Sequence, residues 1–260
     1  MLDATKNDYR HWFIGSISLL LITGIWFVNP IPQDLHYHQF ADQITLLGVP
    51  NFWNVISNAP FVFVALFGFW KVSRPGVLQM HSLRFYQAWV VLIGVFLTGF
   101  GSAYYHYNPN NATLVWDRMP LTLAFMAFLS VVIAEYLSHR MAKKLFLPLL
   151  LIGVTSIVYW DYTESIGQGD LRLYALVQFL PMIVIPFVLG FYSDKSKMTP
   201  HLWWTLIFYG LAKLLEHFDA YILDTLNIMG GHALKHVVAA IAVIYIIKAI
   251  SSSTTDHSAN

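Results

Sequence analysis

The chain has 260 residues, of which 57% are hydrophobic and only 11% are charged, and its formal net charge is +1. A soluble domain carries about a quarter charged residues, so lipid must solvate much of this surface, which excludes an ordinary soluble fold. The near-zero charge excludes nucleic acid as a partner, and the lack of cysteine excludes disulfides, thiolate metal ligands and Cys nucleophiles.

Eight apolar stretches are long enough to span a membrane, since about 17–25 helical residues cross the ~30 Å hydrocarbon layer. Helices are expected because backbone groups must be paired in lipid and the stretches are too long for barrel strands. The predicted spans are Trp12–Val28, Asn54–Val72, Leu83–Tyr105, Arg118–Tyr136, Lys144–Tyr162, Leu171–Tyr192, Leu202–Leu223 and Gly231–Ile250. The predicted fold class is therefore all-α, a polytopic transmembrane helical bundle.

The first span is followed by no small-residue cleavage site, so we interpret it as a retained anchor and not as a removed signal peptide. The four outer connections are predicted at residues 29–53, 106–117, 162–170 and 224–230, and the first of them is the longest. The polar tail Ser251–Asn260 is expected to be disordered.

Basic residues alternate between the two sides of the predicted membrane. One side holds Lys6, Arg10, Lys71, Arg74, Arg84, Arg140, Lys143, Lys144, Lys195, Lys197 and Lys248, and the other side holds Arg118, Arg172 and Lys235. The positive-inside rule then predicts that the N and C termini are both cytoplasmic. The short loops and the lack of cysteine favour a bacterial inner (plasma) membrane.

Five polar side chains fall at one membrane face of this topology. Ser102 and His106 end the third span, Asp117 opens the fourth, and His232 and His236 open the eighth. Ionisable groups at a bilayer are expensive and therefore indicate a functional site. Each also has a structural explanation: a histidine pair can arise by chance, His106 can be an interface residue, Asp117 can favour a helix start, and Ser102 can pack between helices.

The spacing of the histidines suits a metal ion. Residues i and i+4 share one helix face, so His232 and His236 can present two imidazoles to an ion that His106 also binds. Three imidazoles leave zinc a fourth position for water, as in catalytic sites, and zinc lowers the pKa of that water to about 7. Asp117 could then act as general base, and Ser102 could donate a hydrogen bond to the water or the oxyanion.

Four motifs in order resemble the alkaline ceramidase family, which belongs to a wider membrane hydrolase superfamily that includes the adiponectin-type receptors. They are Asn51–Asn58 (NFWNVISN), Gly101–His106 (GSAYYH), Asp117–Pro120 (DRMP) and Gly231–His236 (GHALKH). The family has seven helices, so the resemblance implies a seven-helix core at 54–250, preceded by one extra N-terminal transmembrane helix and outer loop in 1–53 and followed by a polar tail at 251–260.

Carried over to matching positions, the resemblance implies that His106, His232 and His236 are zinc ligands, that Asp117 is the acid/base residue and that Ser102 lies near the metal. It implies hydrolysis of the amide bond of a ceramide-like lipid to a long-chain base and a fatty acid. By the topology above, the metal site is expected near the outer face of the membrane.

The sequence also departs from the family. Eukaryotic members carry calcium-binding acidic residues before the first core helix, where this chain has Asn51 and, in the connection before it, only Asp34 and Asp42; calcium is therefore not expected. Lys235 stands between the last two histidines, where the family tends to have an aromatic residue. A cation there would favour a substrate that carries a carboxylate or phosphate.

The seventh span holds a second polar set. Lys213 and Glu216 are one turn apart and are expected to pair. Asp219 is similar in position to an aspartate of the alkaline ceramidase family, which implies a place near a ligand histidine. His217 is expected to have a structural role inside the bundle more often than a metal-binding one.

Two other classes of function remain open. A metal-containing receptor or sensor, related to the adiponectin-type receptors and without significant turnover, is the main alternative. A transporter would place its charges near the membrane midplane, and a haem protein would oppose its imidazoles across helices. Here the charges lie at one end, and His232 and His236 point to one side.

Overall fold

The structure, a computed structural model, describes residues 9–192 and 196–252. The predictions for Lys6, Lys195 and the tail after Ser252 lie outside these ranges. Within them every named element is helical. The elements are α1 Tyr9–Gly24, η1 Ile25–Phe27, η2 Leu35–His38, α2 Phe52–Ile56, α3 Ala59–Val72, α4 Leu83–Tyr107, α5 Asn111–Val132, the π-helix η3 Ile133–Leu137, α6 His139–Ser165, α7 Arg172–Tyr192, α8 Thr199–His217, α9 Asp219–Leu226 and α10 Gly231–Ser252.

Seven helical stretches among the described residues are long and apolar enough to cross a membrane. They are residues 9–27, 52–72, 83–107, 111–137, 139–165, 172–192 and 231–252. In order, they correspond to seven of the eight predicted spans. They indicate an integral, multi-pass membrane protein, which confirms the predicted all-α class.

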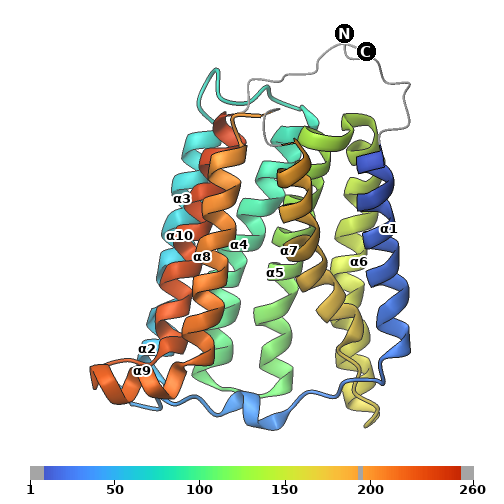
Figure 1. Cartoon of the computed structure of the whole chain (residues 1–260). Helices are drawn as coiled ribbons and strands as arrows, with labels where there is room; N and C mark the ends of the chain where they lie inside the picture. Colours follow the sequence, from blue (N-terminus) through green and yellow to red (C-terminus); the bar gives the residue numbers. More distant parts are fainter. Residues whose placement is uncertain (1–8, 193–195, 253–260) are drawn as a thin grey trace.

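The remaining predicted span, Leu202–Leu223, differs in the structure. The helix ends within it, at His217, so the stretch is divided between α8 and the short α9. α8 is not among the stretches that are apolar enough to count as candidate spans, because Lys213, Glu216 and His217 lower its hydropathy. It nevertheless packs along α10 through the bundle (Figure 1).

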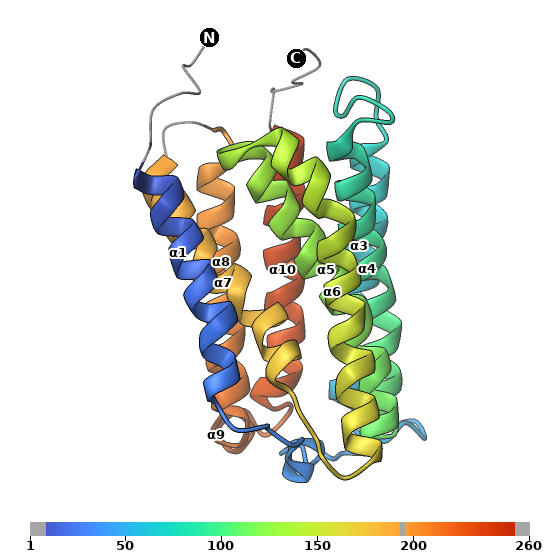
Figure 2. The same cartoon turned by 90° about the vertical axis from the view of Figure 1, so that its right-hand side faces the viewer.

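Six helices form a closed circuit of packed neighbours. α3 packs on α4, α4 on α5, α5 on α7, α7 on α8, α8 on α10, and α10 returns to α3. α6 lies outside this circuit against α5 and α7, and α1 lies at the edge against α7 (Figure 2). The connection from α1 to α2 runs across one end of the bundle (Figure 1).

α4 and α5 approach each other closely at the end of the bundle that the connection from α1 to α2 crosses. A Cβ on Gly101 would lie 2.0 Å from the carbonyl oxygen of Trp116, so only glycine lets the two backbones meet here. The next residues along the chain are Ser102 and Asp117. Small residues at helix contacts are the usual means of close packing in membranes, and this one brings two predicted site residues together.

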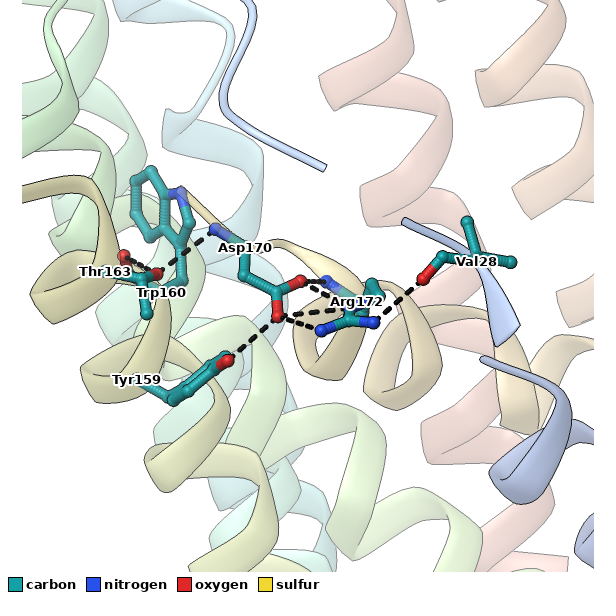
Figure 3. Close-up of polar contacts among 6 residues, drawn as sticks. All are labelled: Val28, Tyr159, Trp160, Thr163, Asp170 and Arg172. Atoms are coloured by element: carbon teal, nitrogen blue, oxygen red, sulfur yellow. Dashed lines mark hydrogen bonds and ion pairs between the residues drawn. The ribbon is translucent and has the colours of Figure 1, made fainter. Parts of the chain in front are cut away.

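A polar network ties the same end of the bundle together (Figure 3). Asp170 accepts hydrogen bonds from the Arg172 guanidinium, at 2.8 Å from Nη2, and from the Tyr159 hydroxyl at 2.8 Å. Arg172 also donates through Nη1 to the carbonyl oxygen of Val28, 2.8 Å away. The Asp170 side chain is only 2% exposed, and Arg172 lowers its pKa to about 2. The network joins α6, α7 and the segment that follows α1.

We predict an acid-dependent loss of stability that depends on Asp170. An unfolded aspartate has a pKa of about 3.9, so the ionised form stabilises the fold by about 2 kcal/mol above about pH 4. That contribution is lost as the pH falls toward the folded pKa of about 2. In thermal unfolding measured between pH 7 and pH 3, Asp170→Asn should have a lower melting temperature than the wild type at pH 7. Its melting temperature should then decrease less than that of the wild type as the pH falls. The exposed Asp161→Asn should follow the wild type; identical curves for all three proteins would contradict the prediction.

We also predict that Gly101→Ala destabilises the protein by about 1–3 kcal/mol, the usual effect of overpacking. The matched control is Gly190→Ala in α7, where an added Cβ would meet nothing within 4 Å and where alanine favours the helix. Melting temperatures in one detergent compare the two variants. If both melt with the wild type, the contact between α4 and α5 is not tight.

Candidate metal centre

Three histidines from two helices converge at the end of the bundle. His106 lies in the last turn of α4, and His232 and His236 lie in the first two turns of α10. One ring nitrogen from each lies within 4.8 Å of the others, so a small inward movement of the rings would bring all three to one ion at about 2.0–2.1 Å per imidazole. All three side chains are buried. This cluster could hold a metal ion.

The hydrogen-bonding state of the three imidazole rings is also compatible with a bound metal ion. His106 Nδ1 and His232 Nε2 are buried and have no hydrogen-bond partner, although a buried unsatisfied polar atom costs about 1–3 kcal/mol. His236 Nδ1 lies 2.8 Å from the Ser57 hydroxyl, which leaves its Nε2 for another partner. Metal-binding histidines commonly have such a hydrogen bond on the nitrogen that does not bind the metal.

The local sequence explains why α10 starts here. A Cβ on Gly231 would lie 2.1 Å from the carbonyl oxygen of Leu215, so glycine lets the start of α10 press against α8. Asp219 Oδ1 accepts a hydrogen bond from the backbone N–H of His232 at 2.8 Å. The negative carboxylate also suits the positive end of the helix dipole. Asp219 thus positions the backbone that carries two of the imidazoles, and it contacts that backbone instead of a ring.

The long connection before α2 covers the histidines. The ring of Phe40, itself 4% exposed, lies 4.6 Å from His106 and 4.8 Å from His232, measured between ring centroids. Asn51 donates from Nδ2 to the carbonyl oxygen of His106 at 2.9 Å. His38, in the same connection, contacts the Tyr105 hydroxyl through Nδ1 and the Asn111 side-chain oxygen through Nε2, each at 2.9 Å. The connection therefore shields the cluster from bulk water.

Ser102 and Asp117 lie beside the cluster. Ser102 is buried and approaches the Asp117 carboxylate as a hydrogen-bonding neighbour. Both line one cavity together with His236. Asp117 does not belong to the group of mutually close ligand atoms, so the structure brings all five predicted site residues to one place without making Asp117 part of the histidine group.

Two hollows meet at this place. An elongated, mostly apolar cavity of ≈ 180 Å³ runs into the bundle between α4, α5, α7, α8 and α10. A second, more open hollow of ≈ 560 Å³ is lined by the segment 36–43, by His232 and by the corner between α8 and α9. Tyr37 and Glu216 line both. The two hollows therefore adjoin at these two residues, one hollow mostly apolar and the other more open.

The second polar set is organised around Glu216. The predicted pair with Lys213 is present, with 2.8 Å between Nζ and Oε2. Lys235 pairs with the other oxygen of the same carboxylate. His217 is exposed and lines the open hollow, so its expected place inside the bundle is wrong, and it lies outside the histidine group.

Two residues that shape the site gave no usable signal in the sequence. Ser57 lies before α3 and reaches His236 across 179 positions of the chain, and Phe40 lies in an irregular connection. The resemblance included Ser57 in its first motif without assigning it a role. A contact between a loop and a distant helix leaves no periodic pattern that would predict it.

Comparisons with protein-family models, curated proteins and solved structures found no match to this chain. The resemblance to the alkaline ceramidase family therefore rests on the four motifs alone.

We predict that His106→Ala lowers the metal content of the purified protein from about one ion per chain to a small fraction, because two imidazoles bind a divalent ion much more weakly than three. His217→Ala, which removes an exposed histidine a short distance away, should keep the wild-type content. Elemental analysis of the protein, purified without added metal, measures both. Equal metal in the wild type and His106→Ala would show that the three histidines do not form the site.

Proposed function

We propose that this chain is a zinc-dependent intramembrane hydrolase, which cleaves the amide bond of a ceramide-like lipid to a long-chain base and a fatty acid. The observation that carries the proposal is the position of the histidine cluster, which lies with Ser102 and Asp117 at the polar end of an apolar cavity. The resemblance to the alkaline ceramidase family supports the same reaction.

Zinc is the metal that best suits the donor set. Imidazole nitrogens suit zinc, and three protein ligands with a free fourth position are typical of its catalytic sites. A bound zinc ion would supply Lewis acidity, which activates water near neutral pH and polarises a carbonyl. The residues that would hold it are His106, His232 and His236, with Ser57 orienting the ring of His236.

Asp117 would transfer the protons, and Ser102 would stabilise the developing negative charge. Amide hydrolysis adds water across the C–N bond, so one proton must leave the attacking water and one must reach the amine nitrogen. Asp117 lines the cavity and is half-buried, so its carboxylate can accept the first proton and deliver it to the leaving nitrogen. The Ser102 hydroxyl is placed to donate a hydrogen bond to the developing oxyanion or to Asp117.

The cavity suits an acyl chain. On α10 its lining extends from Lys235 to Ile246, which corresponds to about 16 Å at 1.5 Å per residue. Val91, Phe128, Met182 and Val243 are among the apolar side chains that line it. A hydrocarbon chain there would leave the amide beside the histidines, and the polar head would face the open hollow, where water and products can exchange.

We further propose how the helices are arranged in the membrane. α8 forms the eighth crossing, and the helices from α2 to α10 form the seven-helix core, with α1 as an N-terminal addition. The position of α1 at the edge, with Ile14 as its one buried residue, supports the last point. The alternation of basic residues favours cytoplasmic termini and a metal site near the outer face of a bacterial inner membrane.

We predict that Asp117→Asn keeps the metal and loses amide hydrolysis by a factor of about 10²–10⁴, the usual contribution of a general acid–base group. Asp224→Asn, an exposed carboxylate in α9, should retain activity. The measurement is release of fatty acid from N-acylsphingosine by purified protein, with metal content determined on the same samples.

The wild type, Asp117→Asn and Asp224→Asn also distinguish the hydrolase from the receptor or sensor. Undiminished turnover in Asp117→Asn would remove that residue from the mechanism. A wild type that binds zinc through the three histidines and turns over no lipid amide would instead favour the receptor or sensor.

A further inference from the structure

Two lysines share one carboxylate beside the metal centre. Lys213 and Glu216 lie on α8, Lys235 lies on α10 between the two histidines, and each lysine pairs with a different oxygen of Glu216. The three side chains are only partly exposed, at 42%, 20% and 16% for Lys213, Glu216 and Lys235 respectively. Among the described residues, Glu216 is the one carboxylate that forms an ion pair with either lysine.

Direct pairing with Glu216 neutralises only one of these two lysines. One ammonium group suffices to balance Glu216, and a second partly desolvated cation costs free energy unless it meets an anion. Nor is the cluster needed to join the two helices, because α8 and α10 already pack tightly at Gly231 and Leu215. The second ammonium group therefore needs an anion other than Glu216.

The cluster lies where a head group would arrive. Lys213 and Lys235 line the apolar cavity, and Glu216 lines both this cavity and the open hollow. The charged residues that line the cavity are these three and Asp117, so lysines and carboxylates balance on their own. A divalent ion on the histidines would add two positive charges that no side chain of the lining opposes.

We propose that Lys213 and Lys235 bind an anionic group on the head of the lipid, so that the preferred substrate is an acyl amide bearing a carboxylate or phosphate close to the amide nitrogen. This inference rests on the proposed hydrolase function. Each ammonium has three N–H donors and gives one to Glu216. The remaining donors can bridge the oxygens of one carboxylate or phosphate, while Glu216 holds the two lysines at a set spacing.

Three lipids that differ only in the head group test the proposal. N-Palmitoylglycine carries a carboxylate, N-palmitoylethanolamine carries a hydroxyl, and the phosphate monoester of the latter carries a phosphate. Binding to the full chain is measured by thermal shift in a nonionic detergent, and hydrolysis is measured by release of palmitate. We expect at least one anionic lipid to bind and react about tenfold better than the neutral one, the effect of a charge-assisted hydrogen bond.

The variants Lys213→Met and Lys235→Met should each lose most of this preference while retaining their metal, whereas Lys213→Arg should keep it. The control Lys248→Met removes a lysine of α10 that lies about 20 Å further along the helix and should keep the preference. The ratio between carboxylate and phosphate lipids identifies which anion is recognised.

The outcomes separate this inference from the hydrolase proposal. Equal binding and turnover of all three lipids by the wild type would overturn the anionic head group and leave the hydrolase intact. A preference for anionic lipids that survives in both Lys213→Met and Lys235→Met would also overturn the anionic head group and leave the hydrolase intact. Preferential binding of an anionic lipid that is never cleaved would support the recognition site and contradict the hydrolase.

Discussion

The arrangement of this protein depends on bringing three imidazoles together where the end of α4 meets the start of α10. Burying the unpartnered ring nitrogens of His106 and His232 costs free energy, which an ion bound between them would recover. The surrounding structure serves this convergence. Gly231 lets α10 start against α8, Asp219 holds the first turn of α10 through its backbone, and the connection that carries Phe40 closes over the rings.

The convergence lies between two environments that a soluble protein rarely combines. On one side the cavity is mostly apolar and extends along the helices, and on the other the hollow under segment 36–43 is open. An amphiphile can place its chain in the first and its head in the second, which puts the bond between them beside the histidines. The proposed function needs a proton acceptor and an anion-binding group at that junction, and Asp117, Glu216 and Lys235 all line the cavity there.

Much of this could be predicted from the sequence, because the relevant signals are local. Apolar length predicts the helices, i,i+4 spacing predicts the shared face of His232 and His236, and the alternation of the spans places His106 at the same end. The break between α8 and α9 was missed because the apolar residues continue across it. The contacts of Ser57 and Phe40 could not be predicted, since they join a loop or a helix start to a distant helix and leave no periodic pattern.

The polar composition of α8, which keeps this helix out of the candidate membrane spans, can be related to the candidate site. Lys213 and Glu216 make α8 a poor membrane span by composition, and Lys235 is the departure from the motif that the resemblance suggests. Glu216 connects the two features, because it pairs with a lysine on its own helix and with the one beside the histidines. A partly buried lysine between the two histidines could not be accommodated at low cost without a carboxylate on the facing helix. The polar residues of α8 and the lysine at position 235 therefore depend on each other through Glu216.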